Sequence, residues 1–444
     1  MYNIKNITKF VKQIILHKLL LITSMHNNLS FLIMRINFVL FALLISMLIL
    51  PSCEKVDTPD GVERDEIKSL KTVWTTQMPF FSPMSSDFVD KTVQLKDGGL
   101  LIYSYPRITK VNSSGKEVWT SSDIRAARFL EIPNGNIITS AYVDDNTSVL
   151  NCLSPDGKIL WSVNTLNNNI SYLALGLDGK VYALSYNILR CPPRDSPDKN
   201  KGVMKVSVIN SETGEISIVS EFSYTNDEES AIRFGEGELY VPNSKQVVLV
   251  TYLYNQTGYG SNYDHFDICL FAINLEDNKT IKKKYGGVKS EAFDGLAVSS
   301  DGSLYILGIT DSNDGDVKSY YNYVMNANAK PWVVKLDSDF NIVWEKVLLL
   351  GDNLRGESIS LGNNSVYITI VGSNQSFFYG MVQLDTLGNY KAVAFDYGPH
   401  ELDNFPHSYV NGKGESFFYF TKTTDEYYKT KTFWMSKKVI EGNL

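Results

Sequence analysis

The residues of this chain best suited to acid–base chemistry are carboxylates and a histidine near the starts of strand-like segments. Asp294, Glu357 and His407 each stand close to an apolar run that follows a loop. Carboxyl and imidazole groups can donate and accept protons. The equivalent position in the other segments is held by Asp90, Arg128, Tyr172 and Ser230. Strands leave polar groups at such positions without any catalytic role, so these residues predict a ligand-binding mouth and no defined catalytic set.

Six tyrosines in two long loops offer a second kind of binding chemistry. Tyrosine combines a flat apolar face with a hydroxyl group, which suits stacking on sugar rings or anchoring a protein partner. Packing of these rings on their own strands is an equal alternative. The six residues are Tyr254, Tyr259, Tyr263, Tyr320, Tyr321 and Tyr323.

An acidic loop around Gly315 offers oxygen ligands for a metal ion. Ca²⁺ prefers several carboxylate and amide oxygens, although the spacing here is not that of an EF-hand. Acidic glycine loops also form ordinary turns, so Ca²⁺ is a possible cofactor and no other is indicated. The four side chains are Asp311, Asn313, Asp314 and Asp316.

These candidates lie within a repeated unit of four strands. Each unit reads as an apolar strand, a glycine-rich turn, a second strand, a variable loop, a third strand, a turn and a fourth strand that often ends in Trp. Tight hairpins favour Gly, Asn and Asp because their central residues take positive φ. The first turn recurs seven times, at Asp97–Gly99, Asn134–Gly135, Asp178–Gly179, Gly235–Gly237, Asp301–Gly302, Gly362–Asn364 and Gly412–Gly414.

Seven such units predict an all-β, seven-bladed β-propeller. The last unit, Tyr409–Val439, supplies only three strands, whereas Lys71–Gln77 (KTVWTTQ) is a strand without a hairpin partner. Pairing the two would close the ring and remove exposed sheet edges. A β-solenoid or two β-sandwiches would leave the first strand unmatched.

The first 52 residues carry a targeting signal. They hold five basic residues and no acidic one, and Arg35 precedes the apolar run Ile36–Leu50. This order is typical of a signal peptide, which could begin at Met34. The sequence Leu50-Pro51-Ser52-Cys53 resembles the lipobox of bacterial lipoproteins, and that resemblance implies a lipidated Cys53. The alternative, an uncleaved membrane helix, would need about 20 apolar residues.

The predicted organisation is therefore a targeting segment (1–52), a tether (53–70) and a propeller (71–444). Without residues 1–52 the formal charge changes from −7 to −12. Such a surface repels phosphate backbones, which argues against nucleic acid as a partner.

One unit carries a closer resemblance. Asp301-Gly302, Gly308, Ser312–Asp316, Trp332–Asp337 and Ile342–Trp344 resemble the propeller repeats common in secreted and lipid-anchored proteins of Bacteroidetes. The resemblance is close over about one unit and loose over the others. It implies a propeller, export and attachment to the cell envelope as an outer-membrane lipoprotein, and no single activity.

The sequence thus predicts an extracytoplasmic propeller, anchored to a membrane through Cys53, that binds a glycan or an envelope protein. Two alternatives stay open: an envelope hydrolase or lyase acting on carbohydrate with Asp294 and Glu357, and a scaffold for envelope assembly. Binding is expected on the face that carries the long insertions, because loops on a rigid scaffold commonly hold function. These insertions are Asn187–Gly202, Tyr254–Asp267, Thr310–Lys330 and Thr423–Lys431.

Overall fold

The computed structural model consists of β-strands in the part of the chain that it describes. It describes residues 67–441 apart from 79–90, 105–106, 123, 125, 127, 145–146, 167–168, 189–200, 226–230, 257–264, 320–329, 352–353, 363, 374–376, 398–406 and 426–429. The predicted targeting segment, Cys53 and most of the tether lie outside these residues. In the described ranges no helix is both long and apolar enough to cross a membrane.

Twenty of the strands form five separate four-stranded sheets, each ordered as in the sequence. The first two are β2 (Lys91–Gln94), β3 (Leu100–Ser104), β4 (Arg107–Val111) and β5 (Glu117–Ser121), then β6 (Arg128–Glu131), β7 (Ile137–Asp144), β8 (Thr147–Leu153) and β9 (Ile159–Leu166). The next two are β10 (Ile170–Leu175), β11 (Val181–Ile188), β12 (Lys201–Ile209) and β13 (Ile216–Thr225), then β14 (Ala231–Asn243), β15 (Gln246–Gln256), β16 (His265–Asn274) and β17 (Thr280–Tyr285). The fifth is β18 (Glu291–Val298), β19 (Leu304–Thr310), β20 (Lys330–Leu336) and β21 (Ile342–Val347).

The other eight strands form one continuous sheet, in the order β22-β23-β24-β25-β1-β28-β27-β26. The prediction of seven separate sheets is therefore wrong for the last two units. They form one sheet because β1 hydrogen-bonds to β25 on one side and to β28 on the other. The strands are β22 (Leu354–Gly362), β23 (Ser365–Ser373), β24 (Phe377–Asp385), β25 (Tyr390–Tyr397), β1 (Ile67–Met78), β26 (His407–Val410), β27 (Glu415–Asp425) and β28 (Thr430–Ile440).

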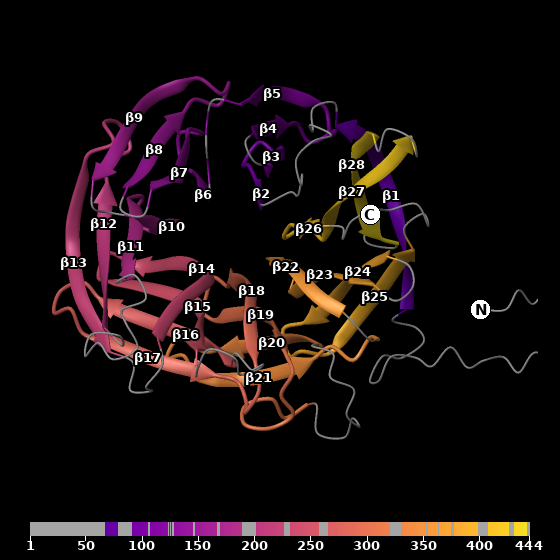
Figure 1. The fold of residues 1–444 in the computed structure, drawn as a ribbon. Helices are drawn as coiled ribbons and strands as arrows, with labels where there is room; N and C mark the ends of the chain where they lie inside the picture. Colours follow the sequence, from indigo (N-terminus) through magenta and orange to yellow (C-terminus); the bar gives the residue numbers. More distant parts are fainter. Residues whose placement is uncertain are drawn as a thin grey trace, which may run out of the picture. The chain divides into compact units, whose positions relative to one another are not determined.

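The sheets form a β-propeller, as the sequence predicts. Figure 1 shows the first strand of each group nearest the centre of the ring and the last strand at its rim. Apolar clusters fill the space between successive sheets: one joins β10–β13 to β14–β17 through Tyr182 and Phe271, and another joins β14–β17 to β18–β21 through Leu270 and Trp332. The cluster of Leu100, Val111 and Phe417 joins the two ends of the chain and closes the ring.

The predicted pairing of the N-terminal strand with the last three strands is confirmed. β1 runs antiparallel to β28, with Trp74 opposite Lys437 and Met78 opposite Phe433. Its first residues also run parallel to β25, with Ile67 opposite Val393. β1 thus lies between the hairpin β24–β25 and the hairpin β27–β28, both of which are far from it in the sequence. Neither β25 nor β28 is left with an unpaired edge along its contact with β1.

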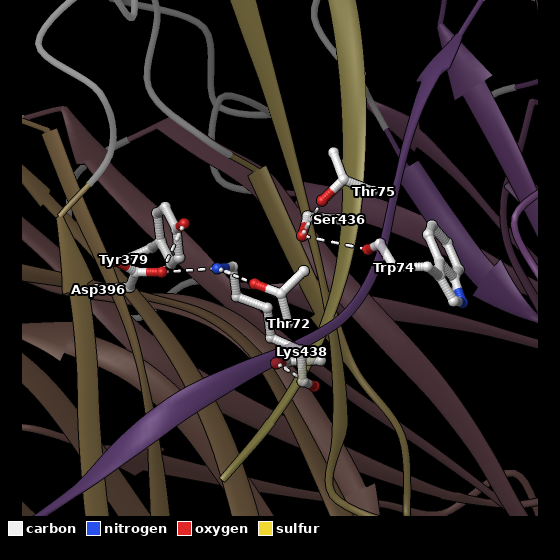
Figure 2. A network of polar contacts seen from close by, with 8 residues as sticks. Thr72, Trp74, Thr75, Tyr379, Asp396, Ser436 and Lys438 are labelled. Carbon is white, nitrogen blue, oxygen red and sulfur yellow. Dashed lines mark hydrogen bonds and ion pairs between the residues drawn. The ribbon is translucent and has the colours of Figure 1, made fainter. Parts of the chain in front are cut away.

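A polar network reinforces this seam (Figure 2). Lys438 Nζ lies 2.6 Å from Asp396 Oδ2 on β25 and donates to Thr72 Oγ1 on β1 at 2.8 Å. Tyr379 OH donates to the same carboxylate at 3.2 Å. The Lys438 side chain is only 7% exposed, against 36% for Asp396. Since a buried ammonium needs partners, this network couples β1, β25 and β28.

Most of the predicted turns are hairpins that need glycine. Gly98, Gly135, Gly179 and Gly302 have φ between +79° and +84°, which non-glycine residues adopt at a cost. One predicted turn is wrong. Gly235–Gly237 lies inside β14 as a bulge, and the hairpin turn follows Asn243, whose Oδ1 accepts a hydrogen bond from the Lys245 amide at 2.8 Å.

At four places, a tryptophan on an outer strand connects one sheet to the next. The Trp119 ring on β5 lies against Gly157, in the last turn of the following sheet, where a Cβ would lie 2.7 Å from Trp119 Cδ2. The Trp119 indole also donates to the Pro155 carbonyl of that turn at 3.0 Å. The same arrangement recurs three times, as Trp74 on Gly115, Trp161 on Gly214 and Trp344 on Gly388.

The contact between Trp119 and Gly157 can be tested with a matched glycine. Gly157→Ala and Gly179→Ala both place a Cβ at positive φ, but nothing lies within 4 Å of a Cβ at Gly179. We expect Gly179→Ala to cost about 1–2 kcal/mol of unfolding free energy from backbone strain. Gly157→Ala is expected to cost about 1–3 kcal/mol more, because the new methyl group displaces the indole. Equal urea midpoints for the two variants would show that the indole contact is unimportant.

The seam network makes a second prediction. Lys438→Met removes the charged hydrogen bonds to Asp396 and Thr72 and is expected to lower the unfolding free energy by about 2 kcal/mol. Lys71→Met is the control, since Lys71 lies exposed on the same β1 strand. Thermal unfolding of both variants measures the difference. A Lys438→Met midpoint equal to that of Lys71→Met would contradict the prediction.

Candidate functional site

Ionisable side chains from several innermost strands meet at the centre of the ring. Burial lowers the pKa of Lys91 on β2, opposed mainly by the charge of Glu238 on β14. Burial raises the pKa of Glu238, opposed in turn by Lys91 and Arg128. Two sheets stand between β2 and β14 in the chain order. These charges can therefore act on one another only across the centre of the ring.

Bulges place several of these residues. The pairing of β14 with β15 shifts between Phe234 and Gly237, so that β14 carries an extra residue beside Glu236. The same irregularity makes Asp294 the extra residue of β18 and Glu357 that of β22. A bulge leaves one residue unpaired and turns its side chain out of the regular alternation. The innermost strands β14, β18 and β22 thus each have a carboxyl side chain at an irregularity in their pairing.

Asp294 and Glu357 differ in their surroundings. Burial, then the charge of Glu357, holds the pKa of Asp294 well above its ordinary value. Asp294 Oδ2 is buried and has no hydrogen-bond partner among the described residues. Glu357, by contrast, accepts from Arg355 Nε at 2.7 Å and also from Arg355 Nη2. Burial therefore favours the neutral form of Asp294, whereas Glu357 is the ion-pair partner of an arginine.

Arg128 on β6 is held against the next sheet. Its Nε donates to the Ser171 carbonyl at 3.0 Å, and its guanidinium carbon lies 5.7 Å from the centre of the Tyr172 ring. Tyr172 is buried at 2% exposure. A cation over an aromatic face is stabilised electrostatically, so Arg128 is fixed in a position from which its charge acts on Lys91 and Glu238.

Several ionisable groups at the centre lack a direct partner in the described part of the chain. No hydrogen bond or ion pair joins the side chains of Lys91, Glu236, Glu238 or Asp294 to any residue in the described part of the chain. The Glu291 carboxylate on the same inner strand as Asp294 is satisfied, in contrast: it accepts from Thr310 Oγ1 and from the Gly287 amide. Because unpaired charges in partly buried sites are costly, the centre has the features of a ligand-binding site. We call Lys91, Glu236, Glu238 and Asp294 the central cluster.

The residues predicted to ring the axis are placed as follows. Arg128, Tyr172, Asp294 and Glu357 lie on innermost strands, as expected. His407 lies on β26 opposite Tyr419, but its side chain is outside the described residues. Asp90 and Ser230 are outside them altogether.

Sequence reasoning missed Lys91, Glu236, Glu238 and Arg355. Glu236 and Glu238 were hidden because the glycines beside them suggested a turn. Their spacing of two residues puts both on one face of a strand, and this signal could have identified them.

The tyrosine-rich loops lie largely outside the described residues. Tyr254 belongs to β15 and pairs with Phe266, while its side chain is not described. Tyr259, Tyr263, Tyr320, Tyr321 and Tyr323 are in undescribed segments. The loop that holds the last three has a well-bonded stem: Glu345 Oε1 accepts from the Ser319 amide at 2.7 Å, and Oε2 from Ser319 Oγ at 2.9 Å. Binding by these tyrosines and by the long insertions stays a prediction.

The acidic loop around Gly315 is bonded to a neighbouring loop. Asp314 Oδ1 accepts from the Val288 amide at 2.8 Å, and Asp316 Oδ2 accepts from the Gly286 amide at 3.2 Å. Asp311 is partly buried and Asn313 is exposed. Within the described ranges, no three His, Cys, Asp or Glu side chains are grouped to hold a metal ion. Two of the four predicted Ca²⁺ ligands thus hold a loop in place, and Ca²⁺ binding stays a prediction.

Comparisons with known proteins found similarity to solved structures and to no family. No protein-family model and no curated protein matches it. It is similar to a Bacteroides caccae protein of unknown function (13% identity, 59% of this chain and 82% of that one, TM-score 0.35). It is also similar to an α-L-arabinanase of Penicillium chrysogenum (10%, 71% and 93%, 0.42) and to the Dos1 propeller (10%, 83% and 95%, 0.45). Since all three TM-scores are below 0.5, we infer no function from them.

The raised pKa of Asp294 predicts a measurable effect on stability. Between the ordinary Asp pKa of about 3.9 and the raised pKa of Asp294, the folded protein keeps a proton that the unfolded chain loses. The unfolding free energy of the wild type therefore falls as pH rises through this window. Asp294→Asn has no carboxyl group that titrates at this position. We therefore expect its stability relative to wild type to increase with pH, as measured by urea unfolding at pH 4, 6 and 8.

Asp301→Asn is the control for this prediction. Hydrogen bonds from Ser299 and Ser303 lower the pKa of Asp301 to about 2. The ionised Asp301 carboxylate stabilises the fold fully above the pKa that Asp has in the unfolded chain. This stabilisation is lost only as the pH falls below that value. The difference between Asp301→Asn and wild type is therefore expected to be constant from pH 6 to 8. A constant difference for Asp294→Asn as well would mean that Asp294 is ionised in the folded protein.

Proposed function

We propose that this chain is a glycan-binding propeller and that its ligand contacts the centre of the ring. The observation that carries the proposal is the central cluster, whose ionisable groups come from three sheets and lack direct partners in the described part of the chain. Sugars present many hydroxyl groups that both donate and accept hydrogen bonds. Charged and neutral carboxyl groups together with an ammonium group match such a ligand.

A glycan suits this location better than a folded protein partner does. Stable protein interfaces bury about 1,200–2,000 Å² and are broad. The central groups are held on innermost strands, and all but Glu236 are partly buried. A narrow, polar ligand can satisfy them one by one, whereas a flat protein surface would leave them unpaired. An envelope protein remains the alternative if binding uses the long insertions instead.

We further propose that the propeller has seven blades, with the eight-stranded sheet counting as two. Its strand order supports this view, because β22–β25 follow the order of the other sheets and β26–β28 are completed by β1.

Membrane attachment through a lipid on Cys53, and a place in the cell envelope, are supported by the N-terminal sequence alone. A stable anchor would need two or more acyl chains.

Glycan binding can be tested with the full-length chain in detergent. The probe is an array of bacterial and plant oligosaccharides, followed by calorimetry on the sugars that bind. Lys91→Met and Glu236→Gln are expected to weaken binding at least tenfold, because each removes a charged hydrogen-bonding group worth about 1.5–3 kcal/mol.

Glu276→Gln is the matched control, since Glu276 is an exposed carboxylate in the turn between β16 and β17. It is expected to bind as the wild type does. The absence of any bound glycan, or unchanged affinity in both central variants, would overturn the proposal. Co-purification with an envelope protein in place of glycan affinity would favour the scaffold alternative.

A further inference from the structure

Asp294 and Glu357 occupy matching places on adjacent strands. Each is the extra residue of a bulge in the innermost strand of its sheet. The two strands pack closely, since a Cβ on Gly295 would lie 3.2 Å from Ile359 Cγ2. The charge of Glu357 also reaches Asp294. Two carboxyl groups are therefore directed to the same part of the ring by the same backbone device.

The two carboxyl groups also differ in their burial and in their hydrogen-bond partners. Asp294 has a buried Oδ2 without a partner in the described residues, and burial favours its neutral form. Glu357 has a side chain that is 7% exposed and is paired with Arg355. A carboxyl group whose neutral form is favoured, together with a second carboxyl group that is hydrogen-bonded to arginine, matches the division of roles in glycoside hydrolysis.

A purely structural role explains this pair less well. Glu345 is a structural carboxylate that uses both oxygens: it accepts from the Ser319 amide through Oε1 and from the Trp332 indole through Oε2. Asp294 Oδ2 stabilises no such contact within the described ranges. Replacing a buried polar group of this kind by a neutral isostere commonly stabilises a protein, so its presence indicates a function.

We propose that Asp294 and Glu357 cleave a glycosidic bond of the glycan bound at the centre of the ring. This inference rests on the proposed glycan binding and adds turnover to it. Asp294 is assigned as the general acid and Glu357 as the nucleophile. Arg355 is assigned as a positioning residue that orients the Glu357 carboxylate.

The reaction proceeds in two balanced steps. Asp294 gives its proton to the glycosidic oxygen, the bond from that oxygen to the anomeric carbon breaks, and the Glu357 carboxylate bonds to that carbon as an ester. Water then attacks the anomeric carbon and gives a proton to the Asp294 carboxylate, and the ester bond to Glu357 breaks. Both side chains return to their starting states, and water is the only co-reactant.

The test uses the full-length chain in detergent and oligosaccharides to which it binds, incubated in H₂¹⁸O. Mass spectrometry of the wild-type reaction is expected to show one ¹⁸O in each new reducing end. Asp294→Asn and Glu357→Gln are expected to lower turnover by about 10²–10⁴-fold. Binding is expected to remain measurable in both, because each amide keeps hydrogen-bonding groups in place. Glu276→Gln is the control with wild-type turnover.

A second variant separates a nucleophile from a merely structural residue. In Glu357→Ala, added azide is expected to restore turnover and to yield a glycosyl azide, because the small anion enters the space that the carboxylate leaves. Glycan binding without ¹⁸O-labelled product in the wild type would overturn the hydrolase inference and leave the proposed binding intact. Full turnover in Asp294→Asn would likewise overturn it. Loss of all glycan binding in the wild type would remove both proposals.

Discussion

The packing of an indole ring on a glycine is the contact on which the arrangement of the sheets depends. Trp74, Trp119, Trp161 and Trp344 each lie under a turn of the next sheet, at a glycine with positive φ. Three of these indoles also donate to a carbonyl of that turn at 3.0 Å. The contact combines apolar burial with a directional hydrogen bond, so it fixes both the spacing and the rotation of neighbouring sheets. At these four places the contact holds the outer strands, and apolar clusters hold the other neighbouring sheets together.

Trp74 connects this contact to ring closure. It lies on β1, and its ring packs on Gly115 and lies 6.1 Å from that of Phe417. The same strand bonds to β25 and β28 and is held by Lys438. One strand therefore performs the sheet-to-sheet contact and the sealing of both edges. A β-sheet ring gains most of its stability only when this last pairing forms, because until then both edges expose unpaired backbone groups.

The sequence predicted these parts of the fold because they depend on local signals. Glycine at a tight turn and tryptophan at the end of a strand reflect constraints that act within a few residues or recur in each unit. The lone strand Lys71–Gln77 could be paired because one unit lacked a strand. The joining of two units into one sheet could not be predicted, since it depends on the register of Ile67–Ser69 against β25, and no composition signal encodes that register.

The candidate site was harder to predict because bulges break the pattern on which sequence reasoning relies. A glycine pair around Glu236 fits a hairpin turn and a bulge equally well, and only the length of β14 decides between them. Asp294 and Glu357 were identified by their place near the start of the first strand of each unit, where side chains are expected to face the axis. Lys91 was missed because Asp90, one residue earlier, was assigned to this position, and the interaction of Lys91 with Glu238 across the ring is not visible in the sequence. The central residues of a propeller are distant in the sequence and close in space. Their interactions therefore form only when the ring closes.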